Sequence, residues 1–269
     1  MPTPYSATLV PMVRKLASRS PLGDAEQRVL LGLPHHLATL DRSSYLVREG
    51  DAPTACAVLL SGFAYRNKIA GDGGRQILSV HLRADLLDLQ NCLLPVADHS
   101  VQALTRIQVA YIPNQALLAA AGNYPAIAQA LLHDTLVDGS IFREWILNVG
   151  RRDARQRIAH LLCELAMRQE AAGLCKGPEY EWPMTQAEIA DAAGLTTVHV
   201  NRTLQSMRSD GLISTSTGRV AILDWPGLQA AGDFTPTYLH QPAIISAQIH
   251  SIASQPPVSM RPALSRYLS

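Results

Sequence analysis

The sequence has few cysteines and no long hydrophobic run, and both absences exclude classes of protein. Its 269 residues include only four cysteines, at positions 56, 92, 163 and 175, and no two of them have the CxxC spacing of zinc or redox sites. We therefore expect reduced thiols, no metal site and a cytoplasmic location. No stretch approaches the roughly 18 apolar residues of a membrane-spanning helix, and the N-terminal segment lacks the apolar core of a secretory signal.

Aromatic residues and net charge are also scarce. Aromatic residues make up 5% of the chain, and the formal net charge is only +1. A nearly neutral chain does not attract the phosphates of nucleic acid as a whole, so a DNA-binding role requires a local basic patch. Hydrophobic residues make up 47% of the chain, and this content with this length predicts a globular protein of two domains.

Short apolar runs alternate with turn residues in the first half of the chain. Four runs rich in Val, Ile, Leu and Tyr lie at 45–51, 55–70, 75–82 and 99–113. Short strands separated by Gly and Asp turns at this spacing predict an antiparallel barrel or sandwich. Residues 71–74 are the expected tip of a hairpin, because turns with positive φ favour Gly and Asp. Ahead of the strands, residues 22–40 are expected to form two short helices.

The middle of the chain predicts helices at 114–124, 125–150 and 152–172. The second is long, and its apolar residues occupy two sides, which indicates two packing partners. A second copy of the same helix would give a coiled-coil-like homodimer, and a helix buried inside one subunit is the alternative. The expected dimer-interface residues are Leu131, Thr135, Asp138, Phe142 and Trp145.

Residues 185–211 have the pattern of two short helices joined at Gly194. Thr185 and Glu188 fit a capping box at the start of the first helix, and Gly194 suits the left-handed turn that ends it. Thr196 can cap the second helix. Its apolar residues recur at i, i+4 and i+7 and are expected to face inward: Val200, Leu204 and Met207. This spacing predicts a helix-turn-helix whose second helix reads DNA.

The outward side of the second helix carries side chains suited to DNA bases. Arg202 can donate two hydrogen bonds to guanine, Asn201 can pair with adenine, and Val198 can contact a thymine methyl group. Polar residues at the helix start suit phosphate contacts. The expected DNA-binding residues are Thr185, Gln186, Thr196, Thr197, Val198, His199, Asn201, Arg202, Gln205 and Arg219.

A wing is predicted directly after the second helix. Residues 210–224 alternate around Gly218, which predicts two strands joined by a tight turn. Within residues 196–219, three arginines stand against one aspartate, so this part of a nearly neutral chain is locally basic. An ordinary helix pair with a solvated face is the alternative interpretation.

The stretch "TQAEIADAAGLTTVHVNRTLQSMRSDGLI" and the following "GRVAILD" closely resemble the winged helix-turn-helix of the cAMP receptor protein/FNR (Crp/Fnr) family of bacterial transcription regulators. The likeness extends over roughly residues 22–232, since the β-rich region resembles the family's cyclic-nucleotide-binding β-roll. The resemblance implies an α+β fold with an N-terminal double-stranded β-helix (jelly roll), a long dimerisation helix and a C-terminal winged helix-turn-helix. It also implies a homodimer that binds near-palindromic double-stranded DNA and contacts RNA polymerase.

The expected domain boundaries follow from the resemblance and from composition. Residues 1–123 are expected to form the β-roll sensor domain with its N-terminal helices, and residues 124–150 the dimerisation helix. Residues 151–232 are the expected DNA-binding domain. Residues 233–269 contain several prolines and serines and are expected to form a loosely packed tail. No nucleophile and base stand in a catalytic arrangement, so no enzymatic activity is expected.

The effector site is where the sequence departs from the family. Cyclic-nucleotide-binding members use a Gly-Glu-Leu stretch and an Arg-Ser pair for the phosphate and ribose, and the aligned residues here are 88–90 and 99–100. Asp88 places a negative charge where the anion should sit, and His99 is mostly neutral at pH 7 unless its pKa is shifted, so cAMP binding is not expected. The expected effector-pocket residues are Asp88, Leu89, Gln90, Asn91, His99 and Ser100.

In the reader helix, Arg202 matches the family's base-reading arginine. Val198 stands where the family has a glutamate, and Asn201 where many members have a serine, so the target sequence is expected to differ from the family's usual one. No cofactor is expected, because the N-terminal cysteine cluster of iron–sulfur members is absent.

Several alternatives stay open for the signal and the function. The sensor domain could bind a cyclic nucleotide or another small ligand, or the protein could be constitutively active. Cys92 could be a thiol sensor, although a small apolar core residue is the simpler interpretation. Haem bound through Pro2 and His81 is a further alternative. A protein that uses the helix pair to bind another protein is the rival outside DNA binding.

Overall fold

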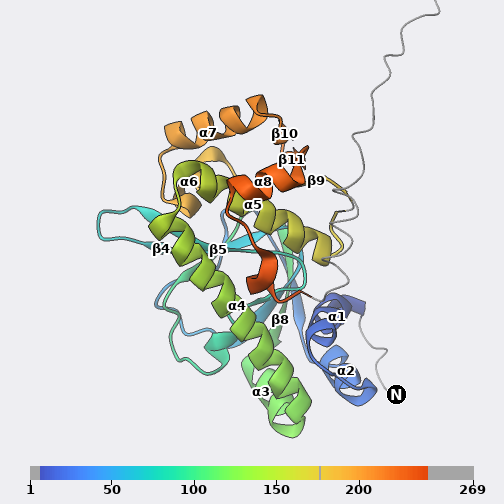
Figure 1. Ribbon diagram of the computed structural model, residues 1–269. Helices are drawn as coiled ribbons and strands as arrows, with labels where there is room; N and C mark the ends of the chain where they lie inside the picture. Colours follow the sequence, from blue (N-terminus) through green and yellow to red (C-terminus); the bar gives the residue numbers. More distant parts are fainter. Residues whose placement is uncertain (1–6, 176, 242–269) are drawn as a thin grey trace, which may run out of the picture.

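The computed structural model describes residues 7–175 and 177–241 (Figure 1). It begins with a short 3-10 helix, η1 (Ala7–Leu9), followed by α1 (Val10–Arg19) and α2 (Asp24–Leu31). The prediction of two helices within residues 22–40 is wrong for the second one. Residues 36–40 instead form strand β1, because their pairing with β8 outweighs any local preference. Helix α1, which the sequence reading missed, buries Met12, Val13 and Leu16.

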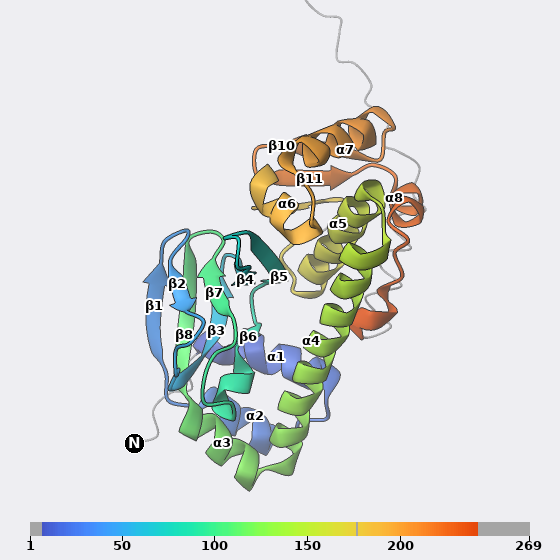
Figure 2. The ribbon, with the colours of Figure 1, turned by 90° about the vertical axis from the view of Figure 1, so that its left-hand side faces the viewer.

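The β-roll consists of two four-stranded antiparallel sheets (Figure 2). Their strand orders are β1-β8-β3-β6 and β2-β7-β4-β5. The strands are β1 (His36–Leu40), β2 (Tyr45–Val47), β3 (Ala55–Ser61), β4 (Ala64–Ile69), β5 (Arg75–His81), β6 (Leu86–Leu87), β7 (Ser100–Ala103) and β8 (Ile107–Pro113). The four predicted runs all contain strands, and the β4–β5 hairpin turns at Gly73, which has a positive φ of 85°.

The space between the two sheets is filled by small and branched side chains. Residues from both sheets share one apolar cluster, among them Leu59, Ala64, Val101 and Val109. Inward-facing residues alternate with outward-facing ones along such strands, so this cluster holds the two sheets together. The short 3-10 helix η2 (Leu89–Cys92) follows β6 and carries three of the six predicted effector residues.

Helix α3 (Asn114–Asn123) and the long helix α4 (Pro125–Arg151) follow the roll. Figure 2 shows α4 running from the base of the roll, beside α3, up to the DNA-binding region. Pro125 is at the first position of α4, where a missing N–H costs little. One side of α4 packs against α1: Ile127 and Leu131 share an apolar cluster with Leu16. The long helix α4 therefore contacts both the N-terminal helix α1 and the roll.

The winged domain begins with α5 (Ala154–Ala171), which is capped by the Asp153 side chain. Its other helices are α6 (Gln186–Ala193), α7 (Thr197–Ser209) and α8 (Trp225–Ala231), and its strands are β9 (Glu179–Glu181), β10 (Ile213–Ser216) and β11 (Arg219–Ile222). The wing was predicted to have two strands, but β9 pairs with β11 and makes a three-stranded sheet. Tyr180 in β9 is buried, so this strand contributes to the core of the domain.

The chain after α8 is part of the domain core as far as it is described. The short 3-10 helix η3 (Pro236–Leu239) packs against α4, and Phe234 and Leu239 are buried. The Tyr238 hydroxyl donates a hydrogen bond to Glu164 at 2.8 Å. The prediction of a loosely packed tail from residue 233 onward is therefore wrong for residues 233–241, and the rest of that segment lies outside the described residues.

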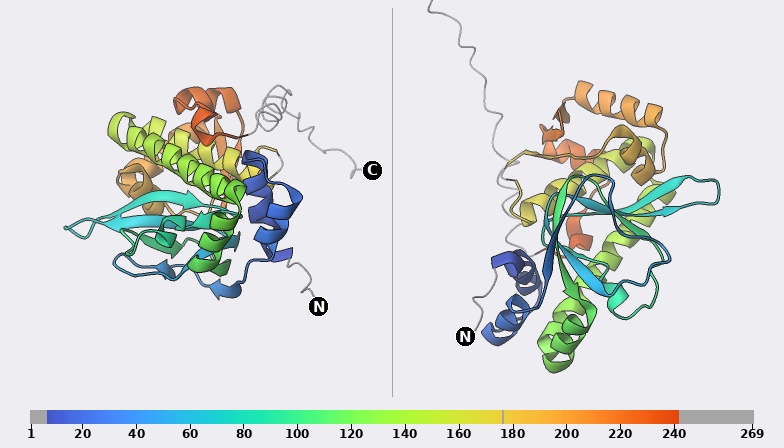
Figure 3. Two further views of the ribbon diagram at one scale, coloured as in Figure 1. Left: turned by 90° about the horizontal axis from the view of Figure 1, so that it is seen from below. Right: turned by 180° about the vertical axis from the view of Figure 1, so that it is seen from behind.

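Two ion pairs connect α6 of the winged domain to the roll. Arg42 contacts Glu188 of α6 at 2.6 Å, and Arg75 of β5 contacts Asp191 of α6 at 2.7 Å. Figure 3 shows the β4–β5 hairpin reaching outward from the roll on the side of α6. The first helix of the helix-turn-helix is thus held by the sensor domain. Within the described residues, no helix is long and apolar enough to cross a membrane.

Candidate nucleic-acid interface and sensor cavity

The turn between α6 and α7 has the backbone that the sequence predicts. Gly194 ends α6 at a φ of 62°, in the left-handed region that side chains disfavour. The Thr185 hydroxyl accepts a hydrogen bond from the Glu188 amide at 3.2 Å, and the Glu188 carboxylate accepts one from the Thr185 amide at 2.7 Å. Thr196 caps α7 by accepting a hydrogen bond from the His199 amide at 3.3 Å. These contacts fix how α7 leaves α6.

Helix α7 buries one side and exposes the other. Val200, Leu204 and Met207 are buried, as their spacing predicts. The structure exposes every predicted DNA-binding residue: Thr185, Gln186, Thr196, Thr197, Val198, His199, Asn201, Arg202, Gln205 and Arg219. Helix α7 lies at the end of the molecule farthest from α3 (Figure 1). Its outer face is therefore open to a partner as large as a DNA duplex.

Two of the predicted DNA-binding residues, Arg202 and Arg219, differ in their ion pairing. Arg219, at the start of β11, donates a hydrogen bond to Glu179 of β9 at 2.6 Å. Arg202 has no ion pair within the described part of the chain. A phosphate or base would have to displace Glu179 from Arg219 but would meet Arg202 unpaired. Arg202 is therefore the stronger candidate for a charged DNA contact.

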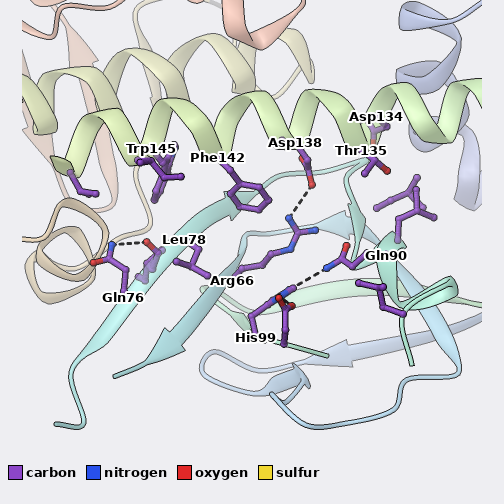
Figure 4. A pocket seen from close by; sticks show the side chains of 18 residues that line it. Arg66, Gln76, Leu78, Gln90, His99, Asp134, Thr135, Asp138, Phe142 and Trp145 are labelled. Atoms are coloured by element: carbon purple, nitrogen blue, oxygen red, sulfur yellow. Dashed lines mark hydrogen bonds and ion pairs between the residues drawn. The ribbon is translucent and has the colours of Figure 1, made fainter. Parts of the chain in front are cut away.

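A cavity of about 580 Å³ lies between the roll and α4 (Figure 4). Its lining is mainly apolar, with Leu78, Leu86, Leu89, Leu94, Phe142, Trp145, Ile146 and Val149 among the lining residues. Its polar side chains include Arg66, Gln90, His99 and Asp138. The size is typical of a small-ligand site, and the position matches the place where the sequence predicts the effector pocket.

The predicted effector residues are only partly on the cavity wall. Leu89, Gln90 and His99 line the cavity. Asp88 and Asn91 are buried, with 2% and 5% of their surface exposed. They lie behind the wall. The sixth predicted residue, Ser100, is half-buried and accepts a hydrogen bond from the Glu49 amide at 3.0 Å, so it serves the roll's own backbone.

The Asp88 carboxylate is paired, which the sequence alone did not show. One of its oxygens, Oδ1, accepts hydrogen bonds from Arg66 Nε at 3.0 Å and Gln90 Nε2 at 3.2 Å, and lies 2.9 Å from His99 Nε2. Arg66 also donates from Nη1 to Asp138 of α4 at 3.0 Å. Arg66 and Asp138 are the residues of this site whose roles sequence reasoning missed. The available signal was an arginine inside the mostly buried strand 64–69.

Ionisation of this group of residues is coupled. Burial alone would raise the pKa of the Asp88 carboxyl, but the hydrogen bond from His99 and the charge of Arg66 hold that pKa below its ordinary value. Burial opposes protonation of His99, yet its contacts with Asp88 and with the exposed carboxylate of Asp98 raise the pKa of the imidazole. The site therefore favours a charged carboxylate next to a protonated histidine.

The thiol and haem alternatives gain no support from the geometry. Burial raises the pKa of the Cys92 thiol to about 11, which disfavours the thiolate that a redox sensor needs. The Cys92 thiol donates to Asn114 Oδ1 at 3.4 Å. His81 is buried, with Nε2 2.9 Å from the Ser79 hydroxyl. Pro2 lies outside the described residues.

Comparisons with known proteins agree with this arrangement. Residues 156–231 match the Crp-like helix-turn-helix domain, and residues 38–124 match the cyclic nucleotide-binding domain. The transcriptional activator protein FnrL of Cereibacter sphaeroides is 30% identical over 211 residues, which cover 73% of this chain and 84% of FnrL. The chain belongs to the Crp/Fnr family.

A second curated relative and a solved structure are also similar to this chain. The nitrogen fixation regulation protein FixK of Azorhizobium caulinodans is 28% identical over 212 residues, covering 79% of this chain and 84% of FixK. The solved structure of FixK2 from Bradyrhizobium japonicum superposes with a TM-score of 0.70 at 22% identity, covering 76% of this chain and all of that one (100%). This likeness confirms the predicted fold of β-roll, long helix and winged domain.

Within this Crp/Fnr chain, the long helix presents a different face from the one predicted for the dimer. Leu131 and Trp145 are buried in the chain's own core, each with 7% of its surface exposed, so neither is available to a partner. Asp138 is paired with Arg66, Phe142 lines the cavity, and Thr135 is exposed.

Three exposed apolar residues of α4 lie one position further along the helix. Leu132 and Leu136 are each 59% exposed, and Ile146 is 69% exposed. With Gly139 and Arg143 they follow the 4-3-4-3 spacing of a coiled-coil seam. A Cβ added at Gly139 would approach only the Arg143 guanidinium, at 3.4 Å, among the described residues. The stripe of residues 132, 136, 139, 143 and 146 is hereafter called the α4 stripe.

Proposed function

We propose that this protein is a homodimeric transcription regulator that binds specific double-stranded DNA through α7. The observation that carries the proposal is the outer face of α7. Val198, Asn201 and Arg202 are exposed on a helix whose inner face and both caps are fixed, and Arg202 has no ion pair in the described chain. An exposed arginine on a pre-positioned helix suits guanine in the major groove. FnrL is named as a transcriptional activator and FixK as a nitrogen fixation regulation protein, and both names support the same function.

The α4 stripe supports the dimer. Leu132, Leu136 and Ile146 place apolar surface on one side of a 27-residue helix whose opposite side is packed within the chain. Isolated apolar residues on a surface are common, but a seam with heptad spacing is typical of helix pairing. Gly139 on the same stripe would let two helices approach closely. Two copies joined along α4 would present two α7 helices, which fits a near-palindromic site with half-sites about one helical turn apart.

Regulation by cyclic AMP is not part of the proposal. A cyclic nucleotide needs a cation for its phosphate, and Arg66, which lines the cavity, is 3% exposed and already contacts two carboxylates. Leu89 cannot hydrogen-bond a ribose. We propose in addition that the protein acts in the cytoplasm and contacts RNA polymerase, as the family resemblance implies.

Selection from sheared genomic DNA tests the function. The purified protein is mixed with fragments of the genome that encodes it, bound fragments are sequenced, and the enriched motif is extracted. We expect a two-fold symmetric motif upstream of coding regions. Recovery of fragments without a shared motif would contradict sequence-specific binding and favour a protein partner for the helix pair.

A second candidate function is an effector-gated regulator that binds a cyclic nucleotide or another small ligand in the β-roll cavity. The observation that favours it is the cavity of about 580 Å³ and its apolar lining, since such sites commonly hold small molecules. Calorimetry with cAMP, cGMP and cyclic dinucleotides separates this candidate from the first. Submicromolar binding of any of them would show that the altered cassette still recognises a nucleotide.

A further inference from the structure

Three charged side chains connect the roll to α4 through the interior. The side chains of Arg66 and Asp88 are each 3% exposed, and Arg66 Nε lies 3.0 Å from Asp88 Oδ1. The same guanidinium reaches Asp138 of α4, with Nη1 3.0 Å from Oδ2, as Figure 4 shows. Arg66 stands on β4, Asp88 precedes η2, and Asp138 is near the middle of α4. The link therefore runs from the effector cassette to the helix that carries the α4 stripe.

The surroundings of Asp88 are those of an anion-binding site. Arg66, Gln90 and His99 all contact one oxygen of its carboxylate. The other oxygen, Oδ2, is buried and lacks a hydrogen-bond partner in the described part of the chain. A buried carboxylate is stable only when cations and donors surround it. The same three donors would serve equally well for a carboxylate or phosphate that is not attached to the chain.

The backbone at Asp88 is also unusual. Its φ is 61° and its ψ is 43°, a left-handed conformation that non-glycine residues adopt at a cost and that Asp and Asn tolerate best. In the resemblance described above, the aligned position is a glycine. Asp88 adopts this conformation despite its energetic cost, and its carboxylate accepts a hydrogen bond from Arg66.

We propose that the Asp88 carboxylate is a tethered anion that fills the anion site of the sensor domain and acts on α4 through Arg66 and Asp138. The inference rests on the proposed DNA-binding function for its regulatory meaning. The wild-type protein then needs no soluble anion to hold the cassette against α4. A chain without this carboxylate would leave Arg66 and His99 free to take a small carboxylate or an inorganic phosphate.

The Asp88→Gly variant tests the proposal, because glycine accepts the left-handed backbone and removes only the side chain. DNA affinity is measured by fluorescence anisotropy on the selected duplex, at constant ionic strength. We expect D88G to bind about ten-fold or more weakly than wild type, within the usual range of coupling between sites. Formate, acetate or phosphate should restore its affinity when it replaces chloride, and should leave the wild type unchanged. Formate or acetate alone would mark a carboxylate site, and phosphate alone a phosphate site.

Two matched variants separate the tether from general electrostatics. Asp98→Asn removes a second carboxylate that contacts the same imidazole, 2.6 Å from His99 Nδ1, but Asp98 is 78% exposed. We expect D98N to bind DNA like wild type. Asp138→Asn keeps the anion site and weakens its connection to α4. We expect D138N to have a lower DNA affinity than wild type, and we expect formate, acetate and phosphate not to restore that affinity.

Thermal unfolding provides a readout that does not depend on DNA. Phosphate or formate should raise the melting temperature of D88G by several degrees relative to chloride, with no such effect on the wild type. If the wild type selects no DNA motif, the proposed function fails while this measurement still decides whether Asp88 occupies an anion site. If D88G does not fold, Asp88→Asn, which keeps the size and tolerates the same backbone, should show the same loss of DNA affinity.

Two results would overturn the tether. The first is wild-type DNA affinity in D88G or D88N, because the carboxylate would then have no influence on α4. The second is a folded D88G whose affinity and melting temperature respond to none of the three anions, because the donors around Asp88 would then not form an anion site.

Discussion

Arg202 is an exposed arginine on α7 with uncharged neighbours, and it has no ion pair within residues 7–175 and 177–241. We expect Arg202→Ala to weaken binding to the selected site by about 1–3 kcal/mol and to relax the preference at one base pair of each half-site. His199→Ala should instead weaken binding evenly across sequences, because His199 is at the helix start beside the backbone amides. Affinities for the selected duplex and single-base variants provide the measurement.

Arg208→Ala is the matched control for the loss of one positive charge from α7. Arg208 lies in the last turn and donates to the Thr215 hydroxyl at 3.0 Å. Its loss should leave base preference intact. If Arg202→Ala and His199→Ala both retain full specificity, α7 does not read the bases.

His99 predicts a specific dependence of stability on pH. Its folded-state pKa is raised by Asp88 and Asp98, against the effects of burial and of Arg66. The stabilisation that protonated His99 supplies is therefore complete below its unfolded pKa, about 6.5. It is lost as pH rises through the higher folded-state pKa. We expect urea unfolding to show a wild-type advantage over His99→Asn at pH 6 that shrinks toward pH 9.

The quantity to compare is the difference in unfolding free energy between the wild type and His99→Asn at each pH. Other histidines contribute to both proteins, and some of them change stability with pH in the opposite direction. Burial lowers the pKa of His160 to about 4, so its contribution declines on acidification instead. A wild-type advantage over His99→Asn that stays constant across this range would show that His99 has no raised pKa.

Sequence reasoning placed the exposed and buried sides of α7 correctly, but only three of its six predicted effector residues line the cavity. Caps, a glycine turn and an i, i+4, i+7 pattern are local, and for α7 they place every side chain on the correct side. The partner of Asp88 is not local: Arg66 is 22 residues away along the chain. The contact between Arg66 and Asp88 depends on how β4 and η2 are placed relative to each other in the folded roll. The sequence showed the added negative charge of Asp88, but it could not show that Arg66 and His99 neutralise this charge.

At the scale of elements, the segment 233–241 is a docked part of the winged domain. Phe234 and Leu239 are buried, and Tyr238 stacks on His160 with ring centroids 5.7 Å apart. Truncation after Gly232 should remove the burial of Phe234 and Leu239, worth about 1.5–3 kcal/mol for each side chain. Truncation after Gln241 should leave stability unchanged. Thermal and urea unfolding of the two truncated chains provide the comparison, and equal stability would contradict the docking.

The α4 stripe makes a separate prediction about assembly. Leu136→Glu places a charge on a side chain that is 59% exposed within the chain, so each subunit should still fold. A charged residue at a coiled-coil seam opposes pairing, so we expect sedimentation to show monomers. Leu118→Glu on α3, also an exposed helical leucine, is the control and should remain dimeric. A dimeric Leu136→Glu protein would place the interface elsewhere.

The elements that sequence reasoning missed share a physical cause. Strand β1 and strand β9 are short and become strands only through pairing with β8 and β11. Two of the predicted interface residues, Leu131 and Trp145, are buried within the chain, because a helix with apolar residues on two sides does not reveal which side the chain itself covers. Long elements with strong periodicity, such as α4 and α5, were predicted closely because their signal lies within their own sequence.

At the scale of the whole molecule, ion pairs as well as the covalent chain connect the sensor domain to the DNA-binding domain. Arg42 and Arg75 of the roll hold Glu188 and Asp191 of α6. Arg168 of α5 contacts Asp85 of the roll at 3.3 Å. The two pairs with α6 are partly exposed and individually weak, whereas the Arg168–Asp85 pair is mostly buried. Together the three pairs hold α5 and α6 against the roll. In the proposed dimer, a displacement of the roll would therefore be expected to move α6 and, with it, α7.

The most direct test of a paired reader is to vary the spacing of the selected DNA site. Affinity is measured for the selected duplex and for one with about five base pairs, half a helical turn, inserted at its centre. If two α7 helices of a dimer read the half-sites, the insertion should lower affinity by about a hundred-fold, because only one helix can then engage. Unchanged affinity for the lengthened site would contradict a homodimer that reads DNA with two α7 helices.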